Sequence, residues 1–416
     1  MLYRELDEKQ LQMTTGKSPA GRSQMTRDVP DAAYRAMRGP IGHAALAELW
    51  NAPWDSAFSK IIPEIGVAFG GHPGLHRARN EDRAVVAEIS LPGEGSFTAA
   101  LICDGVGGSE MGDIAATLAV ATILDELSRP RPGVLLEALL VDAFRKADDV
   151  IRNELRGGGT TTATVILVSS TGRVAAANVG DSRIYAWRPG GSEFRQVSVD
   201  DTIENELRDL PVGDPSVLDA HGLRGRLSQA LGESHRSSSD LRVIVFSSKD
   251  FERGAILASD GAWRGSEDGF RAIALHSENA SDATRRMLAF ARWAGGLDNI
   301  SVIAIQDIAE LALNMKQNRR PERSARAVMW ICESKIVASA FGLHGSDALF
   351  YPASPPSRTK STETRRKKKK WGIYKKDKET DKEAHLNIDD GRDVVRPLEP
   401  RPKVEISVEE EAPPPQ

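Results

Sequence analysis

The chain has 416 residues, a formal net charge of -4, a hydrophobic fraction of 40% and a charged fraction of 27%. These values fit one large or two medium globular domains with additional polar length, and they argue against a generally basic nucleic-acid binder. The two cysteines, Cys103 and Cys332, lie far apart, so the sequence predicts no disulfide framework and no zinc site. A reducing compartment, the cytoplasm, is expected. No apolar run reaches the ~18 residues that a transmembrane helix needs.

Residues 1–60 are polar and are interrupted by glycine and proline. They predict an N-terminal extension that is only partly ordered, with a short helix over 41–50. Trp50 and Trp54 indicate that this extension packs on the body of the protein. The folded body itself is expected over residues 61–307.

Alternating apolar residues and β-branched runs predict the strands of this body, and apolar residues at helical spacing predict its helices. Three long helices are expected, over 112–129, 133–155 and 281–294. Residues 198–240 are polar and irregular, which indicates a surface excursion. The expected strands are 65–69, 84–89, 99–103, 160–168, 174–179, 184–187, 241–246, 255–259 and 300–305.

The chain changes character after residue 306. Residues 308–351 are expected to form a C-terminal helical extension, including a helix over 325–338. Residues 352–416 have too little apolar content to offset chain entropy, so they predict a disordered charged tail. The basic block at 365–370 is either a solvated linker or an electrostatic contact for acidic partners, anionic lipid or nucleic acid.

Four predicted strands lead into or away from an aspartate that is followed by a small residue or asparagine, at Asp104, Asp181, Asp260 and Asp298. A single Asp-Gly pair such as Asp104–Gly105 is more often just an ordinary turn than a metal site. Several carboxylates that converge in one domain repel one another unless cations neutralise them. Carboxylate and carbonyl oxygens are the ligands that magnesium and manganese prefer, and two such ions can deprotonate a bridging water near neutral pH.

Arginines near Glu81 are candidates for binding a phosphate. Arg77 lies four residues before Glu81, and a guanidinium group can hold two phosphate oxygens in a planar fork. Arg79 and Arg83 are more simply interpreted as solvated loop charges.

A set of motifs in fixed order carries a family resemblance. The segments are "GLHRARNED", "LICDGVGGSEMGD", "GGGTTTATVILV", "ANVGDSRIY", "LSQALGE", "ILASDGAW" and "DNISVIAI". Together they resemble the metal-dependent serine/threonine protein phosphatases of type 2C in their bacterial form, over roughly residues 64–307. The resemblance implies an α+β fold, a four-layer α-β-β-α sandwich of two antiparallel sheets flanked by helices, with a dimetal site at one end.

The resemblance also implies a role for each matching residue. Asp104 would bridge two Mn²⁺ or Mg²⁺ ions, and the backbone carbonyl of Gly105 would be a further ligand. Asp260 and Asp298 match ligands of the first ion. Glu81 matches an acid near the second ion.

The remaining matches concern catalysis and a third ion. Asp82 matches the acid that binds the waters of the second ion, and Arg77 matches the phosphate-binding arginine. Asp181 resembles a ligand of a weaker third ion found in bacterial members of the family.

This chain departs from the family pattern at three places. Val106 stands where eukaryotic relatives carry a histidine proposed as general acid, so the leaving group would take its proton from water or elsewhere. Arg264, four residues after Asp260, stands where many members have an aspartate for the third ion. Asp201 replaces a histidine, and the flap over 203–226 is unusual, so substrate choice is the property that transfers least.

The expected activity is hydrolysis of phosphoserine and phosphothreonine in proteins by in-line attack of metal-activated water, without a phosphoenzyme. The expected partners are phosphorylated substrates of a serine/threonine kinase. Two alternatives stay open: a catalytically silent relative that serves as a binding module, and a phosphatase that acts on a regulator in a partner-switching pathway.

Overall fold

The computed structural model describes residues 29–106, 110–191, 193–208, 215–318, 323–340 and 342–343. In this part of the chain the strands form two sheets in which every paired neighbour is antiparallel. The first sheet has six strands, in the order β1 (Phe58–Ile62), β2 (Val67–His72), β11 (Ile300–Ile305), β10 (Gly254–Ala258), β7 (Arg183–Trp187) and β8 (Phe194–Gln196).

The second sheet has eight strands. Their order is β14 (Gly342–Leu343), β13 (Ser334–Ser339), β12 (Arg326–Ile331), β3 (Arg83–Leu91), β4 (Gly95–Cys103), β5 (Ala163–Ser169), β6 (Val174–Val179) and β9 (Ile244–Ser247). Its central strands are almost continuously buried, because one face packs against the first sheet and the other against helices.

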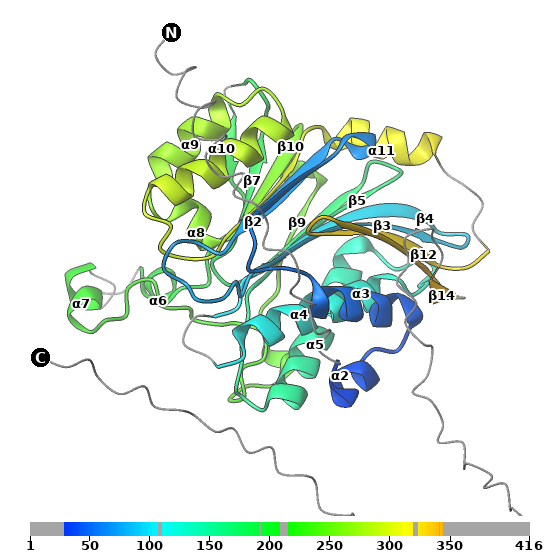
Figure 1. The fold of residues 1–416 in the computed structure, drawn as a ribbon, viewed down its shortest axis with the longest axis horizontal. Helices are drawn as coiled ribbons and strands as arrows, with labels where there is room; N and C mark the ends of the chain where they lie inside the picture. The colour runs from blue at the N-terminus through cyan, green and yellow to red at the C-terminus, as the bar shows by residue number, and fades with distance from the viewer. Residues whose placement is uncertain are drawn as a thin grey trace, which may run out of the picture. The chain divides into compact units, whose positions relative to one another are not determined.

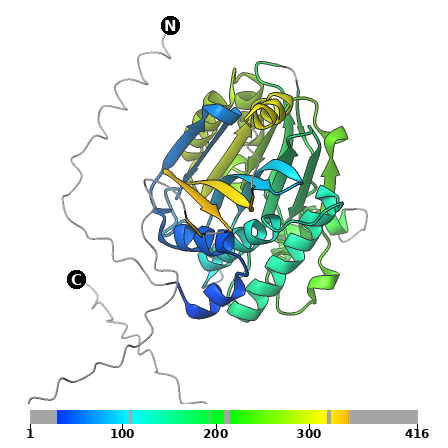
Figure 2. The same cartoon turned by 90° about the vertical axis from the view of Figure 1, so that its right-hand side faces the viewer.

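Helices cover the outer face of each sheet, as Figures 1 and 2 show. The first sheet is covered by α8 (Asp260–Trp263), α9 (Glu267–Leu275) and α10 (Ala280–Trp293), around a core that includes Trp187 and Phe270. The second is covered by α4 (Gly112–Leu127) and α5 (Leu136–Leu155). The predicted four-layer α-β-β-α sandwich is therefore confirmed. No helix in the described ranges is long and apolar enough to span a membrane.

The antiparallel pairing brings the predicted acids to one end of the sandwich. The carboxyl end of β4 lies beside the amino end of β3, where Cys103 pairs with Arg83. The carboxyl end of β10 likewise lies beside the amino ends of β7 and β11. Residues that follow β4 and β10, and residues that precede β3, β7 and β11, therefore meet at the same edge.

The N-terminal extension is attached to the body through α4. After α2 (Asp31–Ala36), the helix α3 (Pro40–Asn51) begins at a buried carboxylate, since Asp125 accepts hydrogen bonds from the backbone N–H groups of Arg38 and Gly39, both at 2.9 Å. Asp125 also accepts from Arg129 Nη2 at 2.8 Å. The expected packing of Trp54 is confirmed, because this side chain is buried in the main core.

Two expectations about the ends of the domain are wrong. Strand β1 belongs to the first sheet although it begins within the expected extension, before residue 61. The C-terminal segment starts with the expected helix, α11 (Ile308–Gln317), but residues 325–338 do not form a helix. They form β12 and most of β13, because the apolar run after Arg326 pairs along the full edge of β3 and is buried there. The predicted disordered tail, 352–416, with its basic block lies outside the described residues.

The irregular excursion contains two short helices, α6 (Ile203–Leu207) and α7 (Pro215–Ala220). It returns to the body through the segment before β9, where Arg236 donates to the fully buried Asp148 on α5. This segment includes Gly225 and Arg226, which reach the pocket described below.

Candidate metal centre

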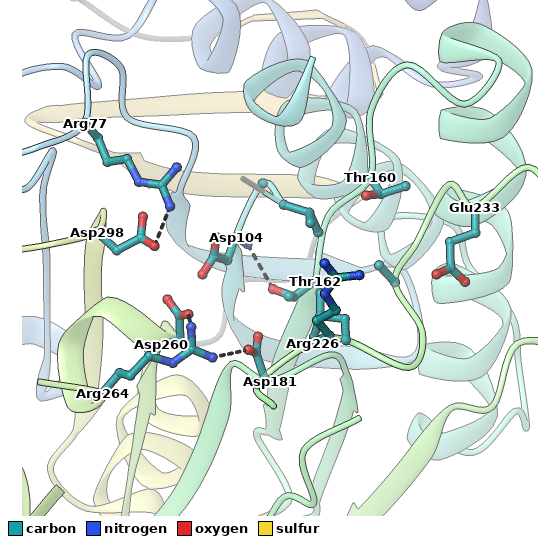
Figure 3. A pocket seen from close by; sticks show the side chains of 15 residues that line it. Arg77, Asp104, Thr160, Thr162, Asp181, Arg226, Glu233, Asp260, Arg264 and Asp298 are labelled. Carbon is teal, nitrogen blue, oxygen red and sulfur yellow. Dashed lines mark hydrogen bonds and ion pairs between the residues drawn. The ribbon is translucent and has the colours of Figure 1, made fainter. Parts of the chain in front are cut away.

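An open pocket of about 420 Å³ lies at the end of the sandwich where the acids meet. Figure 3 shows that the side chains of Asp104, Asp181, Asp260 and Asp298 converge on it from four separate segments of the chain. Arg77, Arg226 and Arg264 also line it. The structure therefore places the four aspartates in the lining of one pocket.

The backbone at Asp104 is fixed by two threonines that directly precede the neighbouring strand β5. The Asp104 N–H donates to Thr162 Oγ1 at 3.0 Å, and the Asp104 carbonyl accepts from the Thr162 N–H and from Thr161 Oγ1, both at 2.8 Å. Thr162 Oγ1 is also 3.0 Å from Ser182 Oγ. The sequence predicted these threonines only as the first residues of a strand over 160–168 and assigned them no role at the site. Their hydroxyl groups orient the main acid of the site.

Gly105 follows Asp104 in a place that has no room for a side chain. A Cβ atom there would lie 2.5 Å from the carbonyl group of Gly112 and 2.9 Å from Glu81 Cβ. The Gly105 N–H also donates to the Glu81 carbonyl at 3.2 Å. Glycine is therefore required for a close approach, and the approach brings Glu81 beside the Asp104–Gly105 turn.

The loop that carries Arg77 and Glu81 is held by one asparagine. Asn299 Oδ1 accepts from the Glu81 N–H at 2.8 Å, and its Nδ2 donates to the carbonyls of Pro73 and Arg79 at 2.8 and 2.9 Å. Because Asn299 directly follows Asp298, this buried amide links two parts of the pocket wall. The sequence pattern identified Asn299 only as the residue that follows Asp298, without a role of its own.

Arg83 corrects an expectation about this loop. It is not a solvated loop charge, because its side chain is buried and donates to the carbonyls of Asn80 and Asp82 and to Thr117 Oγ1. Its guanidinium carbon lies 4.8 Å from the ring centroid of Trp54. Arg83 therefore supports the loop from behind and joins it to the N-terminal extension.

Asp82 lies behind the pocket rather than among the described residues that line it. It is 1% exposed, and its Oδ2 accepts from Ser259 Oγ at 2.8 Å. Burial raises the pKa of Asp82 to about 7, and the charges of Asp260 and Asp298 act in the same direction. The role predicted for Asp82 in binding metal-bound waters stays a prediction.

The pocket acids repel one another. Burial, reinforced by Asp82 and Asp260, raises the pKa of Asp104 well above its usual range. Burial, together with the charge of Asp260, raises the pKa of Asp181 to about 7. Burial also raises the pKa of Asp260, although Arg264 opposes this effect. Buried carboxylates with this property are unfavourable without neutralising cations.

Two guanidinium groups contact three of these acids. Arg77 Nη2 lies 2.7 Å from Asp298 Oδ2. Arg264 Nη1 lies 2.6 Å from Asp260 Oδ2, and its Nη2 lies 2.9 Å from Asp181 Oδ2. In this arrangement no three acidic, histidine or cysteine side chains of the described residues form a closed metal cage.

The donor set nevertheless fits hard divalent cations. Asp260 Oδ1 is buried without a hydrogen-bond partner, and such an orphaned carboxylate oxygen is a natural cation ligand. Asp104 and Asp260 line the same pocket, and Gly105 lines it directly after Asp104. The candidate ligands are carboxylate and carbonyl oxygens, which suit magnesium or manganese and not a soft metal.

The fold and the pocket define a two-sheet α+β protein with a carboxylate site for divalent cations. The family model described as Protein phosphatase 2C matches residues 76–207, the stretch that contains Arg77, Glu81, Asp104 and Asp181. Over this stretch the chain is similar to the protein phosphatase 2C family.

Individual relatives agree with this family. Protein phosphatase PhpP of Streptococcus pneumoniae is 29% identical over 220 residues, which are 50% of this chain and 85% of that protein. Serine/threonine phosphatase stp of Listeria monocytogenes is 29% identical over 246 residues, 56% of this chain and 92% of that protein. In fold, the chain is similar to the serine/threonine phosphatase structure of S. agalactiae, with a TM-score of 0.50, 18% identity, and coverage of 58% of this chain and 98% of that one.

Proposed function

We propose that the protein is a serine/threonine protein phosphatase that hydrolyses phosphoserine and phosphothreonine in proteins and depends on two Mn²⁺ or Mg²⁺ ions. The observation that carries this proposal is the convergence of Asp104, Asp260 and Asp298 on one pocket beside Arg77. The family match and the phosphatase names of the relatives support it.

Asp104, Asp260, Asp298, Glu81 and the Gly105 carbonyl are the groups that would hold the two ions. When bound, the ions would supply a water of lowered pKa for attack on phosphorus and would neutralise charge on the phosphoryl oxygens. We leave Asp181 out of this two-ion set because the family resemblance assigns it to a separate, third ion, and Arg264 forms an ion pair with it.

Arg77 is placed to bind the phosphate. Its side chain is 38% exposed and lies at the pocket rim, where it pairs with Asp298. Burial of this group would lower its pKa, but the hydrogen bond and charge of Asp298 more than offset that effect, so Arg77 remains charged. A substrate phosphate would replace Asp298 as the partner of the Arg77 guanidinium. The Asp298 carboxylate could then bind an ion.

The pocket position directly after the Asp104–Gly105 turn, where a general acid could lie, is occupied by an apolar residue. Val106 lines the pocket directly after the Asp104–Gly105 turn. It has no group that could protonate the leaving serine or threonine oxygen, so we assign that proton to solvent. The proposed substrates are those of a serine/threonine kinase, and the proposed location is the cytoplasm, which agrees with two buried, unpaired cysteines.

The test is hydrolysis of phosphoserine and phosphothreonine peptides with manganese and with EDTA. We expect release of inorganic phosphate with manganese only, and its loss in the Asp260→Asn variant. A matched control is Asp142→Asn, which removes the same charge from an exposed position on α5. Activity in EDTA, or full activity in Asp260→Asn, would refute the proposed site. Manganese binding without turnover of any phosphopeptide would favour a silent binding module.

A further inference from the structure

Arg264 joins two of the pocket acids through separate nitrogens. Nη1 contacts Asp260 and Nη2 contacts Asp181, at 2.6 and 2.9 Å. These acids come from different segments, one following β10 and the other preceding β7. Figure 3 shows the guanidinium group lying between the two carboxylates. The contact is therefore part of the wall of the open pocket, where the Arg264 side chain is 47% exposed and the two acids are largely buried.

The position of Arg264 is fixed by its surroundings. Its N–H donates to the Asp260 carbonyl at 2.8 Å, so the arginine continues the turn of α8. The preceding residue, Trp263, is buried under Arg183, whose guanidinium carbon lies 3.3 Å from the ring centroid. Arg183 in turn is held by Asp200 through three hydrogen bonds. This stacking leaves the Arg264 side chain directed toward the acids.

Arg264 contacts one carboxylate oxygen, Oδ2, of each acid. Asp181 is 5% exposed, and its Oδ2 receives the guanidinium. Asp260 also gives its Oδ2 to Arg264, but its Oδ1 stays buried and without a partner. One oxygen of Asp260 is thus available to an ion on the Asp104 side, while the Asp181 side already has a positive charge.

We propose that Arg264 is a tethered cation of the metal centre: its guanidinium occupies the Asp181 side of the acid cluster, so the centre takes two divalent ions on the Asp104–Asp298 side and none at Asp181. This inference rests on the two-ion site proposed above. A divalent ion at Asp181 would have to displace the guanidinium and then lie beside its charge, which is unfavourable at short range. The arginine is always protonated, so its charge does not depend on the supply of metal.

The test counts manganese ions per chain by equilibrium dialysis with elemental analysis and follows free manganese by electron paramagnetic resonance. The native protein should bind two ions at saturating manganese, and Asp181→Asn should bind the same number with unchanged affinity. Arg264→Ala should bind a third, weaker ion, which the double variant Arg264→Ala/Asp181→Asn should lose. Arg264→Lys, which keeps a positive charge, should return the count to two.

The matched control is Arg226→Ala. Arg226 also lines the pocket, so its removal deletes a nearby guanidinium while the contacts to Asp181 and Asp260 remain. Its manganese count should equal that of the native protein. Thermal melting of each variant establishes that it is folded, and the Asp181→Asn comparison needs no change at Arg264.

Two results would overturn the inference: a third ion in the native protein that Asp181→Asn removes, or a count of two in folded Arg264→Ala. Both leave the two-ion phosphatase standing. A native protein that binds no manganese would instead refute the proposed metal centre itself, so the two failures are distinguishable.

Discussion

Replacing Asp104 by asparagine should have opposite effects on stability with and without metal. Burial raises the pKa of Asp104 and the charges of the neighbouring acids add to this effect, so in EDTA the ionised carboxylate is a source of repulsion. Two like charges about 6 Å apart, at an effective dielectric constant of about 20, repel by about 3 kcal/mol. Partial protonation relieves some of this repulsion, and we expect Asp104→Asn to stabilise the protein in EDTA by about 1–2 kcal/mol.

Manganese should reverse the order. Each ion present at about 100 times its dissociation constant adds about 2.7 kcal/mol to the free energy of unfolding, and Asp104 is the residue expected to contact both ions. One kcal/mol corresponds to about 2–4 °C in melting temperature for a domain of this size. We therefore expect manganese to raise the melting temperature of the native protein by about 10–20 °C, and that of Asp104→Asn by much less.

The assay is thermal unfolding of both proteins at several pH values, in EDTA and in manganese. Folding raises the pKa of Asp82 and of Asp181 from 3.8 to about 7. Between these values the native state binds more protons than the unfolded chain, so stability in EDTA should fall as the pH rises from about 4 to about 7. An Asp104→Asn variant that is less stable than the native protein in EDTA, or that gains equally from manganese, would refute the reasoning.

Three further substitutions test the site and its support. Arg77→Ala should lower kcat/KM on a phosphopeptide about 100-fold while the manganese count stays at two, because the arginine binds phosphate and not metal; an unchanged kcat/KM would contradict its role. Gly105→Ala should weaken manganese binding measured by calorimetry, because the new Cβ would collide with Gly112 and Glu81; native affinity would show that the turn can shift freely. Asp125→Ala should lower the free energy of unfolding in urea by about 3 kcal/mol and expose α3 to proteases, because its buried carboxylate accepts three charge-assisted hydrogen bonds; a stable variant with a protected α3 would contradict that attachment.

The parts of the fold that the sequence predicted are those with strong local patterns. The β-branched run before Ser169 and the apolar run before Asp104 each have one simple interpretation, and both are central strands. The segment over 325–338 contains an apolar run after Arg326, and a short apolar run fits a buried helix or a strand equally by pattern alone. The edge of β3 offers this run hydrogen-bond partners from Val85 to Ser90. Tertiary pairing decided this element, and no local pattern reports the presence of a free edge.

In the candidate site, too, the residues with a local sequence pattern could be predicted, and those that act through distant contacts could not. The acids could be predicted because each follows or precedes a strand, and antiparallel strands bring such ends together. The supporting groups could not, since Thr162, Asn299 and Ser259 act through hydrogen bonds to residues distant in sequence. The correction at Arg83 has the same cause, because burial of that arginine depends on Trp54 and on the loop carbonyls around it.

The two arginines in the pocket have different consequences for metal binding. Arg77 is on a loop and contacts Asp298 only, so a phosphate can draw it away and leave that carboxylate to an ion. Arg264 contacts two acids and is backed by the stacked Trp263, so its displacement would break two ion pairs at once. The two arginines therefore differ in how many pocket acids each one holds. This difference predicts that substrate and metal binding are coupled through Arg77, while the charge supplied by Arg264 is constant through the catalytic cycle.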